Sequence, residues 1–243
     1  MKTLYQNLFN RIDAPAEFSH FVAMRGTEYD KQPNKLMVIG RATNGWESLD
    51  CSSAEAFGAA AQQRFESVGF GWIKDLGRGF ENGDGYYLNR SPFWRVIKGV
   101  VSEMNDISGL DRWFETIVWS NIYKIAPKEN DEKGKPMNPD NRLCRAQIEI
   151  CRDILEKEIN TYKPTHILFI TGYDWWFYDK KKVYGIQELF SDCTAVNNLF
   201  ALGTARFRKD GLDIPVVIAS RPERRKESAY VDAVVNALKG NPV

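Results

Sequence analysis

Four short apolar runs, separated by stretches that suit helices, constrain the fold of this chain more than any other feature. Each run is continuous and rich in β-branched residues, as is typical of strands buried on both faces of a parallel sheet. Small or polar residues follow every run. Strands that alternate with helices predict an α/β fold, a three-layer α/β/α sandwich with a mostly parallel four-stranded sheet and crossover connections. The runs are Leu36–Ile39, Thr116–Trp119, His166–Ile170 and Pro215–Ala219.

The clearest helix is expected to begin at Asn138, a residue suited to the N-cap, with Pro139 at the first helical position. Apolar residues then recur at spacings of three and four, which indicates one face of an amphipathic helix. Lys163 and Pro164 are expected to end this helix, because proline disfavours helical geometry in the residue before it. The apolar face consists of Cys144, Ile148, Cys151, Leu155 and Ile159, and further helices are expected at Ser53–Phe65, Phe93–Met104, Ile186–Phe190 and Tyr230–Leu238.

Composition suits one soluble globular domain, which we expect to span residues 1–243. Hydrophobic residues make up 43% of the chain and charged residues 27%, so a core of ordinary size is available. The net charge of +1 leaves any affinity for nucleic acid to local basic patches. No stretch approaches the roughly 20 apolar residues that a membrane-spanning helix needs, so we expect no membrane association and a cytoplasmic location.

The cysteine and histidine content gives no sign of a metal site. The four cysteines include no pair at the CxxC spacing, and the chain has only two histidines, His20 and His166. Cys144 and Cys151 lie two helical turns apart and are expected to pack in the core, because free cysteine behaves as a small hydrophobe. Disulfides are not expected in a reducing compartment.

We expect an unusual segment at about residues 47–90 to be an insertion between the first two predicted strands. Its second half is rich in glycine and places aromatic residues beside basic ones. Long glycine-rich loops are often lids or binding loops, and aromatics interleaved with basic residues suit stacking on bases. The alternative is that these aromatics, among them Phe70 and Trp72, simply pack onto the domain.

The stretch from Val118 to Gly172 carries a resemblance to the uracil-DNA glycosylase superfamily. A buried strand runs into Asn121, and Asn121, Lys124 and Pro127 match the order of the Asn-x-x-Lys-x-x-Pro block of that superfamily. The helix and strand that follow also match. The resemblance implies that Asn121 reads the edge of the base, since an amide can accept from uracil N3–H and donate to O4. The alternative is that Asn121 satisfies local backbone groups at a strand end.

The turn after the first strand is similar to the water-activating motif of these enzymes, which in one branch is Gly-Glu-Ala-Pro-Gly. Gly40 and Ala42 match this motif, whereas Arg41 stands in place of its Glu and Thr43 in place of its Pro. The resemblance implies that Gly40 and Ala42 line the base pocket, that Arg41 occupies the position of the catalytic acid and that Asn44 orients the water. An ordinary turn between a strand and a loop is the alternative reading.

Two further blocks fit the same resemblance. Where the family has His-Pro-Ser after its last strand, this chain has Arg221 and Pro222, and arginine can stabilise the negative charge on a departing base. The basic residues that follow suit DNA phosphates, or alternatively a solvated helix start. The helix start at Ser91 resembles one that carries a base-stacking aromatic, which makes Phe93 the stacking candidate, unless it is a core anchor. The basic residues are Arg224, Arg225 and Lys226.

The iron–sulfur branches of the superfamily supply the nearest form of the Asn121 block, with a cysteine next to the lysine. Ile125 stands at that cysteine position here, and Cys151 alone resembles a cluster ligand. A cluster needs about four thiolates, so we expect no iron–sulfur cluster and no other cofactor.

The resemblance implies a glycosylase that flips a uracil-like base out of DNA and hydrolyses its N-glycosidic bond. The loss of the acid at Arg41 favours an alternative, a non-catalytic nucleic-acid or nucleotide binder on the same fold. A small-molecule hydrolase on a similar sheet is the third possibility. Single- or double-stranded DNA is the partner expected under the first reading.

Overall fold

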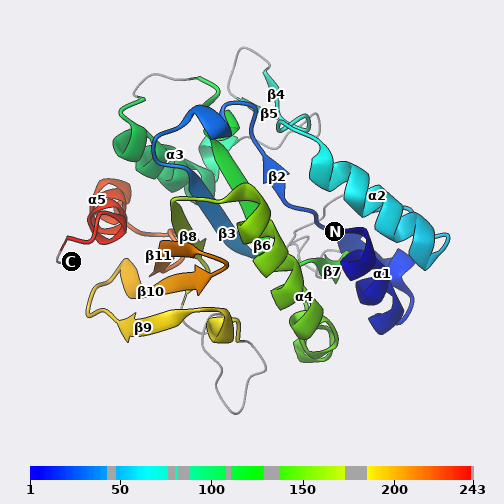
Figure 1. Ribbon diagram of the computed structural model, residues 1–243. Coiled ribbons are helices and arrows are strands. Elements are labelled where there is room, and N and C mark those ends of the chain that lie inside the picture. Colours follow the sequence, from blue (N-terminus) through cyan, green and yellow to red (C-terminus); the bar gives the residue numbers. More distant parts are fainter. Residues whose placement is uncertain are drawn as a thin grey trace.

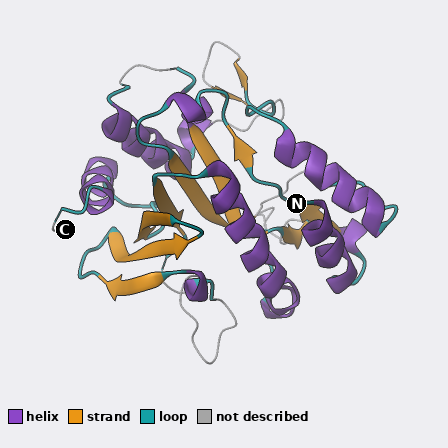
Figure 2. Cartoon of the chain, in the orientation of Figure 1, coloured by secondary structure: helices purple, strands orange, loops and turns teal. Residues whose placement is uncertain are grey.

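A seven-stranded sheet forms the centre of the molecule in the computed structural model, and helices cover both of its faces (Figures 1 and 2). The structure describes residues 1–42, 48–75, 80–81, 88–107, 111–128, 137–172 and 185–241. Across the sheet the strands follow the order β2 (Met24–Arg25), β6 (Ile117–Tyr123), β3 (Leu36–Ala42), β8 (His166–Ile170), β11 (Leu212–Ala219), β10 (Ala201–Lys209) and β9 (Ser191–Ala195).

The four strands predicted from the sequence form the parallel centre of this sheet. β6 pairs with β3, β3 with β8, and β8 with β11, all in parallel, so their carboxyl ends lie along one edge. In the register of β3 and β6, Gly40 lies opposite Asn121. The predicted α/β class and mostly parallel sheet are confirmed, but four strands were too few. β2, β10 and β9 extend the sheet as antiparallel strands. The buried residues of β10 alternate with half-buried ones, and β2 and β9 have at most one buried residue each, so none of the three forms a continuous buried run.

The helices pack on the two faces of the sheet in two separate apolar clusters. One cluster joins the sheet to α1 (Lys2–Arg11), α2 (Ala54–Glu66) and α4 (Asn141–Tyr162), and the other joins it to α3 (Pro92–Asn105) and α5 (Glu227–Leu238). Alternation along β3 shows the same division, because Met37 and Ile39 belong to the first cluster whereas Leu36 and Val38 belong to the second. No helix among the described residues is long and apolar enough to cross a membrane.

The helix ends show where the sequence prediction was right and where it was wrong. α4 begins after Asp140, not Asn138, because the Asp140 carboxylate accepts a hydrogen bond from the Leu143 N–H at 2.8 Å. Pro139 therefore lies before the helix. Its predicted end is confirmed, since Lys163 takes up left-handed geometry and its N–H bonds to the Ile159 carbonyl. In place of a helix at Ile186–Phe190 there is only a three-residue 3₁₀ turn, η6 (Gln187–Leu189).

Shorter elements surround the main sheet. β1 (Phe18–His20) pairs antiparallel with β7 (Ile125–Pro127), and β4 (Lys74–Asp75) pairs with β5 (Phe80–Glu81). The remaining elements are the 3₁₀ helices η1 (Pro15–Glu17), η2 (Tyr29–Lys31), η3 (Leu88–Arg90) and η4 (Trp113–Thr116).

His20, the last residue of β1, is fully buried and is held by hydrogen bonds on both ring nitrogens. Nδ1 accepts from the Leu49 N–H at 3.1 Å, so Nε2 carries the proton and donates to the Pro15 carbonyl at 2.9 Å. Desolvation lowers the pKa of His20 to about 4, because a charged imidazolium would be buried and would lose its acceptor at Nδ1. The imidazole is therefore neutral in the folded protein at neutral pH.

Stability is expected to fall in acid through His20. Its pKa is about 4 in the folded state and about 6.5 in the unfolded state, so the unfolded chain binds the proton first. This contribution is complete above pH 6.5 and is lost as the pH falls, by about 2 to 3 kcal/mol between pH 7 and pH 4.5. Urea unfolding across that range should show a shallower pH dependence in His20→Gln than in the wild type. A His20 Cε1 proton that titrates near pH 6.5 by NMR would contradict the expectation.

Candidate functional site

Three of the residues predicted to bind the base meet at the carboxyl edge of the parallel strands. Gly40 of β3 lies opposite Asn121 of β6, and a methyl group at Gly40 would clash with the Asn121 Oδ1 atom. The same methyl group would lie 3.9 Å from Cε2 of Phe93, in the first turn of α3. Glycine at position 40 thus makes the room in which the Asn121 amide lies next to the Phe93 ring.

The amide of Asn121 is buried but incompletely hydrogen-bonded. The residue is only 2% exposed, and its Nδ2 atom has no hydrogen-bond partner among the described residues. A buried donor left unsatisfied costs about 1–3 kcal/mol, so most such donors are paired in folded proteins. The alternative reading, in which this side chain satisfies local backbone groups, leaves that donor unexplained. A ligand with an acceptor atom would satisfy it.

Phe93 and its neighbour Trp94 differ in burial. Trp94 is buried and stacks edge-on against Trp119 at 4.9 Å, which makes it the core anchor. Phe93 is half-buried and meets Trp94 edge-on at 5.1 Å, and its Cε2 edge lies towards Gly40. From the segment at 47–90, Phe70 and Trp72 pack onto this aromatic cluster. Phe57 and Phe65 of the same segment lie in α2 and pack on the opposite face of the sheet. The side chains of Phe80, Tyr86 and Tyr87 lie outside the described part of the chain.

Arg41 extends from β3 to the end of β8. Its Nε donates a hydrogen bond to the Thr171 carbonyl at 2.6 Å. Gly172, the next residue, has a φ of +76°, and a methyl group there would lie 3.3 Å from Arg41 Nη2. The guanidinium thus lies across the ends of two neighbouring strands, in a half-buried position. Asn44, the candidate for orienting water, lies outside the described residues.

The remaining described site residues have their contacts elsewhere. Ala42 packs against the cluster of α1, α2 and α4, on the opposite side from Phe93. Arg221 follows the end of β11 at the same edge of the sheet, but its side chain is 52% exposed and pairs with Glu223. The three basic residues before α5 are exposed, and none forms an ion pair with a described residue; they are Arg224, Arg225 and Lys226.

A buried polar network behind β6 was not foreseen from the sequence. The Lys124 ammonium forms hydrogen bonds with both carboxylate oxygens of Glu158, at 2.8 and 3.0 Å, and with the Ser120 hydroxyl at 2.7 Å. Lys124 and Glu158 are both fully buried. The sequence did contain one indication that Glu158 is buried, because this residue lies seven positions after Cys151 and therefore on the apolar face of α4.

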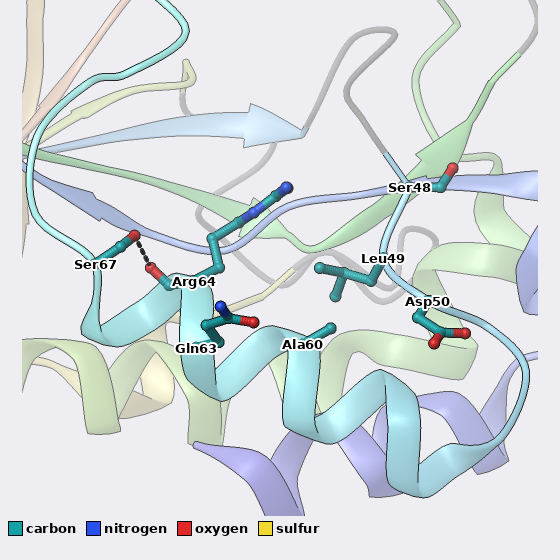
Figure 3. Close-up of a pocket in the computed structure, with 7 residues that line it drawn as sticks. All are labelled: Ser48, Leu49, Asp50, Ala60, Gln63, Arg64 and Ser67. Atoms are coloured by element: carbon teal, nitrogen blue, oxygen red, sulfur yellow. Dashed lines mark hydrogen bonds between the residues drawn. The ribbon is translucent and has the colours of Figure 1, made fainter.

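A surface hollow lies next to α2, and none of the predicted site residues lines it (Figure 3). In Figure 3 the Arg64 side chain rises from α2 between the helix and the chain after residue 47, and the Ser67 hydroxyl bonds to the Arg64 carbonyl. Its lining consists of Ser48, Leu49, Asp50, Ala60, Gln63, Arg64 and Ser67.

The described residues include no group of three or more His, Cys, Asp or Glu side chains placed to hold a metal ion. Burial raises the pKa of the Cys144 and Cys151 thiols to about 12, so both are neutral, and both are free. A scan against protein-family models and a search of curated proteins gave no match for this chain.

Proposed function

We propose that this chain is a divergent uracil-DNA glycosylase-like protein, which binds a uracil-like base flipped out of DNA and hydrolyses its N-glycosidic bond. The observation that carries the proposal is the buried Asn121 amide, which lies against Gly40 beside the Phe93 ring and has an unpartnered Nδ2. An amide presents one acceptor and two donors, which match the N3–H and the O4 of uracil. Cytosine presents the opposite pattern at these two positions.

Each remaining residue has a role in this proposal. Phe93 stacks on the flipped base, and Asn44 orients the water that attacks the sugar C1′ atom. As the bond from C1′ to the base nitrogen breaks, its electron pair leaves with the base, and Arg221 stabilises the resulting anion. The attacking water releases a proton to solvent, and the released base anion takes one up from solvent. The ion pair of Arg221 with Glu223 is half-exposed and therefore weak enough to exchange for this contact. Arg224, Arg225 and Lys226 hold the DNA phosphates.

Arg41 favours a second candidate function, a binder of the same base that does not hydrolyse it. A guanidinium stays protonated at all physiological pH values and cannot accept a proton from water. Because Arg41 is also fixed to the Thr171 carbonyl, it stands where the related motif has its carboxylate without supplying a base. The binder keeps the contacts of Gly40, Phe93 and Asn121 and lacks the chemical step.

A strand-cleavage assay separates these candidates, and the Asn121→Ala variant ties its result to this site. Wild-type protein is incubated with single- and double-stranded DNA that contains uracil, hypoxanthine or mismatched thymine, and abasic sites are then cleaved with alkali. We expect strand breaks at uracil, reduced about 10²-fold by Asn121→Ala, because the side chain supplies hydrogen bonds that position the reacting base. The variant should unfold at the same temperature as the wild type or above it, since it removes a buried donor that lacks a partner.

Two further variants make the result specific. Gly40→Ala is expected to reduce strand breaks as Asn121→Ala does, because the added methyl group displaces the amide. Asn236→Ala removes an exposed asparagine on α5 and should leave activity unchanged. Salt-dependent binding of uracil-containing DNA without breaks would support the binder. Neither breaks nor binding, or breaks that persist in Asn121→Ala, would rule out this site as a reader of uracil in DNA.

A further inference from the structure

The polar network behind β6 is closed to solvent and complete within itself. The Lys124 ammonium has three donors, and its partners are the two carboxylate oxygens of Glu158 and the hydroxyl of Ser120. The Ser120 hydroxyl in turn donates to Glu158 Oε2 at 2.6 Å. The network therefore offers no free group to a ligand, and its role must be exerted through the residues that it holds.

Stability alone is a weak reason for such a network. The cost of removing two charges from water roughly cancels their attraction, and apolar pairs of similar size often replace buried ion pairs without loss of stability. The Lys124–Glu158 pair lies among apolar residues of the cluster formed by the sheet and α4, a place that an apolar pair could fill.

The network acts on the residue next to Asn121. Adjacent residues of a strand point to opposite faces of the sheet. Ser120 points towards α4, where it is bonded to Glu158 and Lys124, and Asn121 points towards α3, where it meets Gly40 and Phe93. Because the two side chains leave the strand on opposite faces of the sheet, holding the Ser120 side chain in place also fixes the direction in which the Asn121 side chain points.

A second contact from α4 holds the chain beyond Asn121. The Gln147 side chain is fully buried, and its Oε1 accepts from the N–H groups of Lys124 at 3.1 Å and Ile125 at 2.9 Å. Its Nε2 donates to the Ile125 carbonyl at 2.8 Å. Side chains of α4 thus form hydrogen bonds with the chain both just before and just after Asn121.

We infer that Ser120, Lys124 and Glu158 are positioning residues, which hold the Asn121 amide in the direction needed to read a base. The inference rests on the function proposed above. It assigns a role to the lysine of the Asn121 block that requires no contact with DNA or with the base. α4, through Glu158, belongs to the site although no residue of the helix lines it.

The decisive variant removes both charges together. Lys124→Met/Glu158→Leu replaces the pair with apolar side chains of similar size, so the fold is retained while Ser120 loses both partners. We expect kcat on uracil-containing DNA to fall about 10²-fold with KM nearly unchanged, since misplacement of a positioning group by about 1 Å has an effect of this size. If the wild type only binds DNA, its preference for uracil over thymine should fall instead.

An NMR readout keeps this test independent of the proposed function. In protein labelled with ¹⁵N-asparagine, the Asn121 side-chain amide resonance should move in the double variant. It should also move in Ser120→Ala, which leaves the ion pair in place and serves if the double variant does not fold. Glu156→Gln, on the same helix as Glu158, weakens a partly exposed pair with Lys209 of β10 and should move neither this resonance nor the activity.

The outcomes separate the two proposals. A folded double variant with wild-type discrimination of uracil and an unmoved Asn121 resonance would overturn the positioning role. If wild-type protein neither cleaves nor binds uracil-containing DNA, the proposed function fails, and the resonance in Ser120→Ala then decides the positioning role by itself.

Discussion

Glu158→Leu alone is expected to lower the free energy of unfolding by about 3–5 kcal/mol. The variant leaves the Lys124 ammonium fully buried with only the Ser120 hydroxyl as a partner. An unpaired charge in such a place must be hydrated by local opening or must lose its proton, and both are unfavourable. Urea unfolding of the wild type and the variant at pH 7 measures the difference.

A double-mutant cycle gives this expectation its control. Lys124→Met alone leaves the Glu158 carboxylate unpaired and should be destabilising to a similar degree, whereas the double variant should lie within about 1 kcal/mol of the wild type. Glu156→Gln, at a partly exposed position of the same helix, should change stability by less than about 1 kcal/mol. Single effects that simply add in the double variant would show that the two charges do not stabilise each other.

The parallel centre of the fold was predictable because its signal is local. Strands such as Leu36–Ile39 are buried on both faces, and this burial appears in the sequence as an unbroken apolar run. β10 is different, because Ala205 and Phe207 face the core and alternate with Thr204, Arg206 and Arg208. A half-buried strand such as β10 is identified by its pairing with β11, and this pairing cannot be read from the sequence.

The same difference between local and long-range signals explains which parts of the candidate site could be predicted. The resemblance placed Gly40 and Asn121 in one pocket, and their proximity has a local cause, because each follows an apolar run and the ends of parallel strands meet at one edge. Glu158 and Gln147 lie more than twenty residues from the groups that they bind, and no short motif records such a pairing. The start of α4 was predicted two residues too early, which is a smaller error. Asn138 and Asp140 both suit an N-cap, and Asp140 is the one that caps the helix.

Gly26→Ala should destabilise the protein by about 3 kcal/mol or more, because backbone atoms fill the space that the methyl group needs. Gly26 is buried next to β2, and its N–H bonds to the Ile117 carbonyl at 2.9 Å. A methyl group there would lie 2.5 Å from the Glu115 Cα atom and would clash with the Glu115 carbonyl. A side chain could rotate away from such a contact, but here the main chain itself would have to move.

The displaced chain would also lose the bonds that Glu115 makes to the segment after β2. The Glu115 carbonyl accepts from the Glu28 N–H, and its buried carboxylate accepts from the Thr27 N–H, each at 2.9 Å. Gly71→Ala is the matched control, because nothing lies within 4 Å of the position that its methyl group would occupy, and it should change stability by less than about 0.5 kcal/mol. Urea midpoints compare the two variants directly. Equal midpoints would mean that the chain at Gly26 is not packed against Glu115, whereas a large loss confined to Gly26→Ala would show that this contact fixes β2 at the edge of the sheet.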